Sequence, residues 1–339
     1  MNQIKVSVLV PVYGVAKYIE RCARSLFEQT MTYGIEYIFI DDSTPDNSIE
    51  ILLNTLAKYP ERKNQVKIVR HETNLGLAEA RVTALNVSHG EYVIHCDSDD
   101  WVAPEMYELM YQKAYETGAD IVGCDYTKAY GKSHIVQTEK FTLPHKHIIT
   151  EILKGRKIGG YLWNRLIRRD FYLKHKFRAD KGITLFEDMA VTIPMHLVTD
   201  KIAYVNKPLY FHRLEDKTSM SGKLNEKSIK SSVTVLQKLA MLSLSPVDRK
   251  SLYSNLKYQL FTRLNTFHSY NPQEWRHYEL PFIRQSGLKL STYEKASKWL
   301  IEHRMPKIQH GLMLINKLAS KSAITNLKIL LKKLHPGNR

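Results

Sequence analysis

The chain has 339 residues, of which 43% are hydrophobic and 25% are charged, a composition typical of a globular protein rather than a disordered one. No run of about 18 uncharged apolar residues occurs, so no membrane-spanning helix is expected, and the N-terminus lacks the pattern of a secretory signal. The three cysteines lack metal-ligand spacing and fit a reducing compartment. We therefore predict a cytoplasmic protein.

The net charge of +16 is concentrated in the C-terminal third of the chain. Residues 1–220 contain 29 Lys and Arg against 28 Asp and Glu, whereas residues 221–339 contain 21 against 6. A basic tail is typical of contact with an anionic surface. Residues 323–334 form an amphipathic helical pattern, which predicts peripheral binding to the inner face of the plasma membrane. A helix packed on its own domain explains the pattern equally well, and the tail has no recognised nucleic-acid-binding motif.

Apolar, β-branched runs alternate with helical patterns through the first half of the chain. Strands are predicted at 6–12, 37–40, 66–69 and 92–96, and helices near 15–29, 46–58 and 76–88. A helix beginning near Pro104 and a strand at 119–126 continue the series. This alternation predicts an α/β fold with a Rossmann-like, mostly parallel sheet flanked by helices. We expect this domain to cover residues 1–220 and a basic helical region to cover 221–339, which would contact a membrane surface or a second subunit.

Polar segments follow each of the first four predicted strands. In chain order they read PVYG, DDSTPDNS, HETNLG and DSDD. Ligands of such sheets bind at the carboxyl ends of the strands. We therefore expect the four segments to meet in one crevice.

The segment VIHCDSDDW (93–101) places three carboxylates within four positions, directly after a predicted buried strand. Like charges at this spacing repel each other and require a cation or several hydrogen-bond donors. Asp97 and Asp99 can bind Mg²⁺ or Mn²⁺, which prefers carboxylate oxygen and neutralises charge on a departing diphosphate. The alternative is an acidic turn that caps the helix near Pro104.

Two further segments carry candidate nucleotide ligands. In DDSTPDNS, Asp41 and Asp42 lie at a strand end, where a carboxylate can accept a hydrogen bond from a uracil ring, although the segment can also cap the next helix. In NLGLAEAR, Gly76 allows close approach of the backbone to a ligand. Arg81 follows within the predicted helix, where it can contact a nucleotide or pair with an acidic side chain.

The order and spacing of these motifs resemble those of glycosyltransferase family 2, whose members are inverting, share the GT-A fold and use nucleotide-activated sugars. The resemblance covers about residues 4–220. It implies nucleoside binding by Pro11, Tyr13, Asp41, Asp42 and Arg81, and binding of the metal and diphosphate by Asp97 and chiefly Asp99. The family frequently has asparagine after that arginine, and this chain has Val82.

The segment LFEDMAVTIPM (185–195) resembles the family's ED signature, in which the aspartate deprotonates the acceptor hydroxyl. An inverting transfer requires one carboxylate on the face opposite the leaving diphosphate. The resemblance implies that Asp188 is the catalytic base and that Glu187 orients the base or the acceptor. Two acids favoured at a helix N-terminus are the alternative explanation.

Two later segments also resemble parts of the family's site. In YLWNRLIRRDF (161–171), Trp163 would offer a stacking surface to an acceptor sugar, with a buried core tryptophan as the equal alternative. In YFHRLEDKTSMS (210–221), His212 and Arg213 would stabilise the leaving diphosphate.

The resemblance implies a metal-dependent hexosyl- or N-acetylhexosaminyltransferase. We expect it to move a sugar from a nucleotide sugar, with UDP as the expected nucleotide, to a glycan or lipid-linked acceptor in cell-surface polysaccharide synthesis. The chain lacks the glycine-rich phosphate loop of a sugar nucleotidyltransferase and the GxGxxG motif of a dinucleotide oxidoreductase. A catalytically inactive module that binds a nucleotide or a membrane is the remaining alternative, which Asp97, Asp99 and Asp188 argue against.

Overall fold

The computed structural model describes residues 3–139, 141, 144–155, 157–214 and 226–258. The chain divides into two compact units, Met1–Lys223 and Leu224–Arg339. The amphipathic pattern at 323–334 lies outside the described residues, so its predicted membrane contact stays a prediction.

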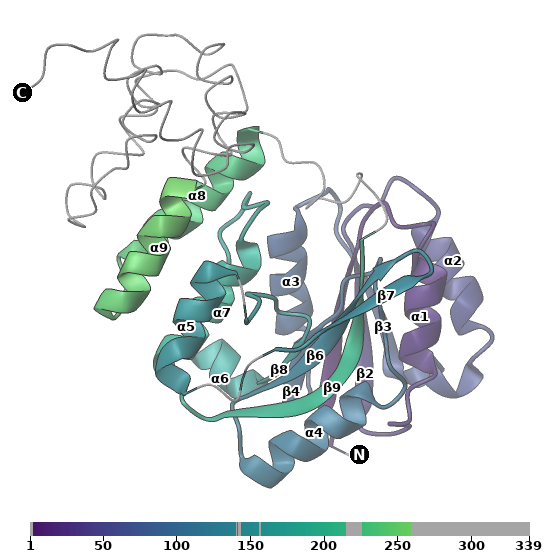
Figure 1. Cartoon of the computed structure of the whole chain (residues 1–339). Helices are drawn as coiled ribbons and strands as arrows, with labels where there is room; N and C mark the ends of the chain where they lie inside the picture. Colours follow the sequence, from purple (N-terminus) through teal and green to yellow (C-terminus); the bar gives the residue numbers. More distant parts are fainter. Residues whose placement is uncertain (1–2, 140, 142–143, 156, 215–225, 259–339) are drawn as a thin grey trace, which may run out of the picture. The chain divides into compact units, whose positions relative to one another are not determined.

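In the described part of the first unit, nine strands form one mixed sheet (Figure 1). Eight of them run in the order β3-β2-β1-β4-β8-β6-β9-β5, and β7 pairs with β6. The strands are β1 (Val6–Val12), β2 (Ile35–Asp41), β3 (Val66–Arg70), β4 (Tyr92–His95), β5 (Trp101–Val102), β6 (Ile121–Tyr130), β7 (Ser133–Gln137), β8 (Arg165–Arg168) and β9 (Ile202–Arg213). The helices of this unit are α1 (Ile19–Phe27), α2 (Ser48–Leu56), the 3₁₀ helix η1 (Pro60–Gln65), α3 (Leu77–Asn86), α4 (Met106–Thr117), α5 (His145–Lys154), α6 (Arg169–Lys174) and α7 (Glu187–Val198).

The α/β fold predicted from the sequence is confirmed. Strand β1 pairs in parallel with β2 and β4, and β2 pairs in parallel with β3. The carboxyl ends of these four strands therefore lie at one edge of the sheet, where the polar segments were expected to meet. The strands and helices predicted between residues 6 and 126 all occur, with boundaries shifted by a few residues.

Alternate side chains of β1 enter two different cores, as the two-residue period of a strand requires. Val8 and Val10 are fully buried in the cluster that includes residues of α1, α2 and α4. Leu9 is fully buried in the cluster that includes residues of α3, α6 and α7. Helices thus cover both faces of the sheet, which explains why the strands read as nearly continuous apolar runs.

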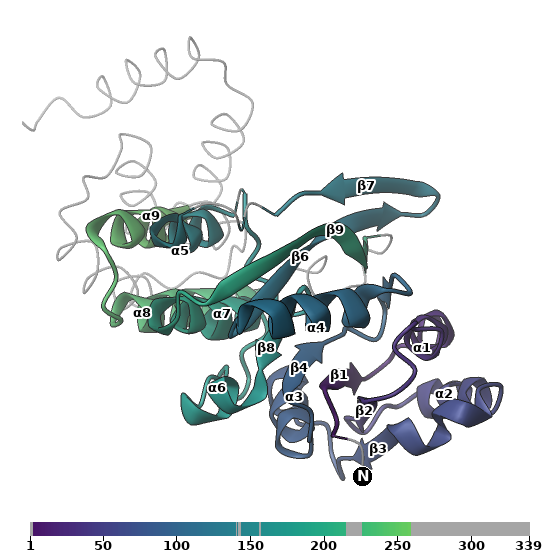
Figure 2. The same cartoon turned by 90° about the horizontal axis from the view of Figure 1, so that it is seen from below.

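Beyond β4 the sheet becomes mixed. Strand β8 pairs antiparallel with both β4 and β6, and β6 pairs in parallel with β9. Strands β6 and β7 form a hairpin at one end of the sheet (Figure 2). The pairing of β5 with β9 places Trp101 opposite Phe211. This pairing brings the end of β9 beside the acidic segment that follows β4.

The described part of the second unit consists of α8 (Glu226–Ala240) and α9 (Pro246–Tyr258). Ser245 caps α9, because its hydroxyl accepts a hydrogen bond from the Asp248 amide at 3.1 Å and donates one to the Asp248 carboxylate at 2.6 Å. Pro246 occupies the first turn, where its missing amide hydrogen costs little.

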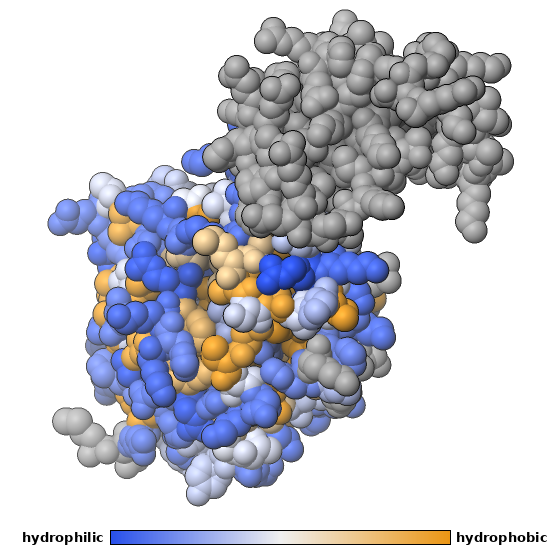
Figure 3. Space-filling view, turned by 90° about the vertical axis from the view of Figure 1, so that its left-hand side faces the viewer, coloured by the Kyte–Doolittle hydropathy of each residue, from blue (hydrophilic) through white to orange (hydrophobic). Residues whose placement is uncertain are grey.

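The face that Figure 3 presents is mostly hydrophilic, with a group of apolar side chains on it. The exposed large apolar residues include Val198, Met241 and Val247. No helix within the described residues is long and apolar enough to cross a membrane.

Candidate active site

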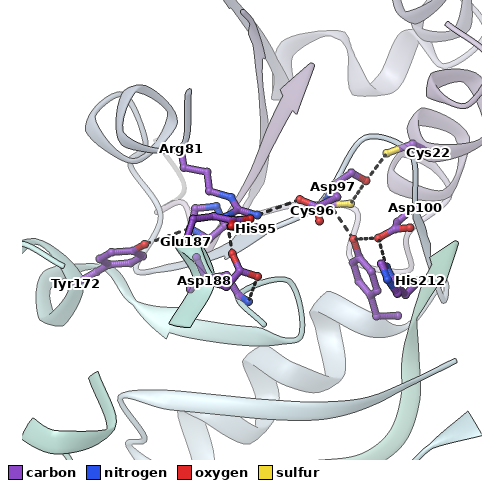
Figure 4. A network of polar contacts seen from close by, with 12 residues as sticks. Cys22, Arg81, His95, Cys96, Asp97, Asp100, Tyr172, Glu187, Asp188 and His212 are labelled. Atoms are coloured by element: carbon purple, nitrogen blue, oxygen red, sulfur yellow. Dashed lines mark hydrogen bonds and ion pairs between the residues drawn. The ribbon is translucent and has the colours of Figure 1, made fainter. Parts of the chain in front are cut away.

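The acidic segment after β4 is anchored to the end of β9 through Asp100 (Figure 4). The Asp100 carboxylate is buried and accepts hydrogen bonds from the Tyr210 hydroxyl at 2.8 Å and the Arg213 amide at 2.7 Å. His212 Nδ1 lies 3.2 Å from the same carboxylate. The sequence interpretation gave Asp100 no role of its own. Its position beside two other acids was the only signal, and that signal does not distinguish an anchor from a ligand.

Asp99 points toward the same strand end and is more accessible. Its Oδ2 accepts a hydrogen bond from Arg213 Nη2 at 2.8 Å, and its side chain is 28% exposed. The Arg213 guanidinium lies 3.8 Å from the ring centre of Tyr18. The structure therefore brings Asp99, His212 and Arg213 together, as expected for residues that bind a diphosphate.

The residues present fit a divalent cation bound together with a diphosphate. The described part of the chain contains no group of three or more His, Cys, Asp or Glu side chains that could hold a metal ion by itself. Asp99 nevertheless offers a partly exposed carboxylate, the hard oxygen ligand that Mg²⁺ and Mn²⁺ prefer. Mg²⁺ usually takes only one or two protein carboxylates and completes its coordination with phosphate and water.

Arg81 is the centre of a second acidic cluster (Figure 4). Its side chain is 7% exposed, and its Nη1 donates a hydrogen bond to Asp188 Oδ1 at 2.5 Å. Its Nη2 donates to Asp97 Oδ1 at 3.2 Å, and Glu187 Oε1 lies 3.8 Å from Nη1. Arg81 was predicted to line the nucleoside site. In the structure it contacts Asp97, a predicted metal ligand, and Asp188 and Glu187, the predicted base and its neighbour.

This clustering shifts the protonation of several groups. Burial raises the pKa of Asp97 to about 7, with the nearby charges of Asp100, Asp188 and Asp99 adding to the effect and Arg81 opposing it. Burial and then repulsion from Asp188 raise the pKa of Glu187 to about 7, again against the attraction of Arg81. Burial opposes the charge on Arg81, but the three neighbouring carboxylates outweigh it and raise its pKa. Ionisation of Asp97 and Glu187 in this cluster is therefore less favourable than ionisation in water.

Asp188 is held at the start of α7 from two sides. Its Oδ1 accepts the hydrogen bond from Arg81, and its Oδ2 accepts one from the Leu162 amide at 3.1 Å. The preceding Phe186 has φ of +68°, a conformation that non-glycine residues rarely adopt. Such strain is concentrated at functional sites. The role of the Leu162 amide had no signal in the sequence, because any residue supplies a backbone N–H.

The two aspartates predicted to bind the nucleoside are both engaged by the protein. Asp42 accepts hydrogen bonds from the amides of Leu75 and Gly76, each at 2.8 Å, and Asp42 Oδ1 lies 2.7 Å from His71 Nδ1. Asp42 thus fixes the turn that begins α3. Asp41 Oδ1 accepts the Thr44 amide at 2.8 Å. The nucleoside-binding role of both residues stays a prediction.

Pro11 and Tyr13 lie at the end of β1, beside the Asp41 turn. Pro11 pairs with Ile40 in the sheet, and Tyr13 is 51% exposed. The Gly14 amide donates to the Thr44 hydroxyl at 2.9 Å, which ties the two segments together. The exposed phenol ring of Tyr13 is available to stack on a base.

Trp163 occupies the core rather than an open acceptor surface. It is 2% exposed, and its ring stacks against Tyr161 and Tyr210 at centroid distances of 4.5 and 4.3 Å. Of the two alternatives, the structure therefore shows the buried tryptophan, and its ring faces are not available for stacking on a sugar. Its ring also stacks on His212 at 5.4 Å, so it supports the diphosphate side of the site.

Comparison with known proteins identifies the family. The model of "Glycosyl transferase family 2" matches residues 7–175. The glycosyltransferase GlyG of Streptococcus pneumoniae serotype 4 is 30% identical over 220 residues, which cover 61% of this chain and 70% of GlyG. The chain belongs to glycosyl transferase family 2. The matches to EpsH and EpsJ of Bacillus subtilis, at 33% and 30% identity, span about 60% of the length of each relative.

Solved structures agree with this membership at the level of the fold. The structure of residues 1–349 of S. aureus TarS in complex with UDP-GlcNAc has a TM-score of 0.70 at 19% identity, covering 92% of this chain and 91% of that one. A mannosyltransferase from Pyrobaculum calidifontis, in complex with GDP-Man and Mn²⁺, has a TM-score of 0.55 at 14% identity, with 94% and 88% coverage. The fold of this family member is therefore that of GT-A glycosyltransferases.

Proposed function

We propose that the chain is an inverting hexosyl- or N-acetylhexosaminyltransferase that moves a sugar from a UDP-sugar to a hydroxyl of a glycan or lipid-linked acceptor. The observation that carries the proposal is the contact of one buried guanidinium, that of Arg81, with Asp97 after β4 and Asp188 on α7. A single displacement needs stabilisation of the leaving diphosphate on the donor side and a base on the acceptor side, close together and in fixed orientation.

The relatives support a nucleotide-sugar donor. TarS was crystallised with UDP-GlcNAc, and the Pyrobaculum mannosyltransferase with GDP-Man and Mn²⁺. A further relative, 30% identical over 264 residues covering 73% of this chain and 68% of the relative, is the cholesterol galactosyltransferase of Borreliella burgdorferi. Its name combines a hexosyl group with a lipid acceptor. We extend both features to this chain, in the synthesis of a cell-surface polysaccharide.

Asp188 is the proposed base. The acceptor oxygen attacks the anomeric carbon, its proton passes to the Asp188 carboxylate, and the bond between the sugar and the diphosphate breaks, with inversion at that carbon. A carboxylate has about four acceptor positions. The hydrogen bonds from Arg81 and Leu162 therefore orient Asp188 and leave room for the acceptor hydroxyl.

The leaving UDP is stabilised at the opposite end of the cluster. Arg213 and His212, next to Asp99 and Asp100, supply the positive charge that a departing diphosphate requires. Burial opposes a charge on His212, but its hydrogen bond to Asp100 and the nearby carboxylates outweigh this and raise its pKa. Mg²⁺ or Mn²⁺ held by Asp99, with Asp97 beside it, would neutralise charge on the diphosphate when bound.

We also propose a cytoplasmic location at the inner face of the plasma membrane. The support is the basic composition of residues 221–339, with 21 Lys and Arg against 6 Asp and Glu. Removal of residues 308–339 is expected to release the protein from anionic vesicles. Unchanged vesicle binding by the shortened chain would contradict this part of the proposal.

Calorimetric titration with UDP, GDP and dTDP, each with and without Mn²⁺, tests the donor. We expect binding of UDP that requires Mn²⁺ and is lost in Asp99→Asn, followed by release of UDP from a UDP-sugar when acceptor is present. Glu105→Gln, which alters a partly exposed carboxyl group just before α4, is the matched control and should bind as the native chain does. Binding of UDP without any turnover of UDP-sugars would favour the inactive nucleotide-binding module instead.

A further inference from the structure

The backbone of residues 159–164, the segment that precedes β8, lies against the start of α7. Its Leu162 amide donates a hydrogen bond to Asp188 Oδ2 at 3.1 Å. The Thr192 hydroxyl donates to the Gly160 carbonyl at 3.2 Å. A Cβ atom at Gly160 would lie 2.6 Å from Met189 Cγ, closer than non-bonded carbon atoms approach one another. The course of this backbone therefore determines how the carboxylate of the proposed base is oriented.

Arg165, the first residue of β8, holds this segment from within the protein. Its side chain is fully buried. Its Nη2 donates to the Gly159 carbonyl at 2.6 Å, and its Nη1 donates to the Tyr161 carbonyl. Its backbone amide donates to the Leu162 carbonyl at 3.1 Å. One residue thus binds three carbonyl groups of the segment whose amide reaches Asp188.

Glu139 holds the other side of Gly159. Its carboxylate is 4% exposed and accepts the Gly159 amide through both oxygens, at 3.1 and 3.0 Å. Burial raises the pKa of Glu139 to about 7, and the charge of Arg165 opposes this rise. Burial lowers the pKa of Arg165, against the attraction of Glu139 and then of Asp188. Because arginine stays protonated in proteins, a buried cation remains beside the segment.

We propose that Arg165 is a positioning residue for sugar transfer, which fixes residues 159–164 so that the Leu162 amide orients the Asp188 carboxylate. A guanidinium presents its N–H groups in a rigid planar fork, whereas a lysine ammonium is a compact charge on a flexible stem. A buried carbonyl that loses its donor is unfavourable, so the segment shifts when the fork is replaced. The proposal rests on the proposed function, since it takes Asp188 as the base.

Hydrogen exchange of the ligand-free protein, measured on peptides that contain residues 159–164, tests the anchoring of the segment. Arg165→Lys should speed exchange in these peptides at least tenfold and leave β1 as protected as in the native chain. Arg168→Lys is the matched control on the same strand. Arg168 also donates to two carbonyls, those of Gly118 and Ala119, which lie outside the segment. The control should leave exchange of residues 159–164 unchanged.

Release of UDP from UDP-glucose, UDP-galactose and UDP-GlcNAc, with water as the acceptor, tests the effect on the base. In this reaction the water oxygen attacks the anomeric carbon, its proton passes to Asp188, and UDP leaves. Arg165→Lys should lower kcat about 10- to 100-fold, because a displacement of about 1 Å costs roughly 100-fold in rate. The KM for the UDP-sugar should change less than threefold, and Arg168→Lys should keep the native kcat.

A double-variant cycle separates positioning from general damage to the fold. In Asp188→Asn, the further change Arg165→Lys should lower the rate less than about twofold, because Arg165 acts through a carboxylate that is already absent. General damage would lower the rate by the same factor with or without Asp188.

Glu139 offers a second pair of variants, which decides the matter if Arg165→Lys does not fold. Glu139→Ala should lower kcat in the same Asp188-dependent manner. Glu139→Gln should recover most of the rate, since its side-chain oxygen still accepts the Gly159 amide.

Three results would overturn the proposal: native exchange of residues 159–164 in Arg165→Lys, a native kcat in that variant, or an equal loss in both Asp188 backgrounds. Absence of UDP release by the native chain from all three sugars would instead overturn the proposed function. The exchange result would then still decide whether Arg165 anchors the segment.

Discussion

Arg81 and Asp188, 107 residues apart in the sequence, are joined by a hydrogen bond of 2.5 Å between Nη1 and Oδ1. The other terminal nitrogen of Arg81 reaches Asp97, so the end of β4 and the start of α7 are held by one guanidinium. With the Leu162 amide on its second oxygen, the Asp188 carboxylate is oriented by the protein itself. This orientation is the preorganisation that a general base requires.

Replacement of Asp188 by asparagine is expected to lower the rate of sugar transfer about 10²- to 10⁴-fold, because the acceptor proton loses its base. UDP affinity should change by no more than a few fold, since Asp188 is proposed to act on the acceptor and not on the nucleotide. Initial rates of UDP release with acceptor present, together with calorimetry, measure both effects. Asp170→Asn, an exposed position at the start of α6, serves as the control. A transfer rate within tenfold of native would remove Asp188 as the base.

Replacement of Arg81 by methionine is expected to lower the free energy of unfolding by about 3 kcal/mol, because three largely buried carboxylates lose their shared cation. Urea unfolding followed by circular dichroism measures this loss. Arg24→Met on α1 removes an exposed pair with Glu28 and should cost far less stability. Similar losses in the two variants would show that the Arg81 cluster adds nothing to stability.

Glu187 is expected to make the folding stability of the protein depend on pH. Burial and the charge of Asp188 raise its pKa to about 7, from an ordinary value of 4.5. A raised carboxyl pKa contributes stability that is complete below pH 4.5 and is lost as the pH rises through 7. Between pH 4.5 and pH 8, the free energy of unfolding of the native chain should therefore fall by roughly 3 kcal/mol at most relative to that of Glu187→Gln.

Urea unfolding of native protein and Glu187→Gln at pH 5 and pH 8 measures this difference. Glu61→Gln, which alters an exposed carboxyl group on η1, should show the same difference from native at both pH values. A difference between native and Glu187→Gln that does not change with pH would contradict the assigned protonation of Glu187.

Gly76→Ala is expected to destabilise the protein by about 1–3 kcal/mol. Gly76 precedes α3 with φ of +90° and ψ of 162°, a region that is accessible essentially to glycine alone. Its amide also donates to Asp42, so any relaxation of the backbone disturbs that hydrogen bond. Thermal unfolding measures the change. Gly118→Ala, in an ordinary left-handed helix cap, should cost about 1 kcal/mol or less, and a larger loss there than at Gly76 would contradict this account.

The first four strands and the acids that follow them could be predicted because they depend on local patterns. Apolar runs such as 6–12 are buried on both faces, and parallel strands bring their polar ends to one edge. The position of Glu187 and Asp188 at a helix start was also predicted, and α7 begins at Glu187.

The remaining features depend on contacts between distant segments. The four-residue strand β8 was not predicted, since it has few residues and lies between β4 and β6, which are earlier in the chain. The burial of Trp163 depends on Tyr161 and Tyr210 covering its faces, and the motif around it does not contain that information. The hydrogen bonds of the Asp42 carboxylate to the amides of Leu75 and Gly76, 33 and 34 residues away, likewise could not be read from the motif around Asp42.

The insertion of β8 between β4 and β6 limits how hybrid enzymes can be built from this chain and a relative. Strand β4, with the acidic segment after it, is paired to a segment some 75 residues later, and the Arg213 amide at the end of β9 is hydrogen-bonded to Asp100. The segments around β4, β8 and β9 therefore cannot be exchanged independently of one another. A functional hybrid would have to take the whole stretch 92–213 from one parent.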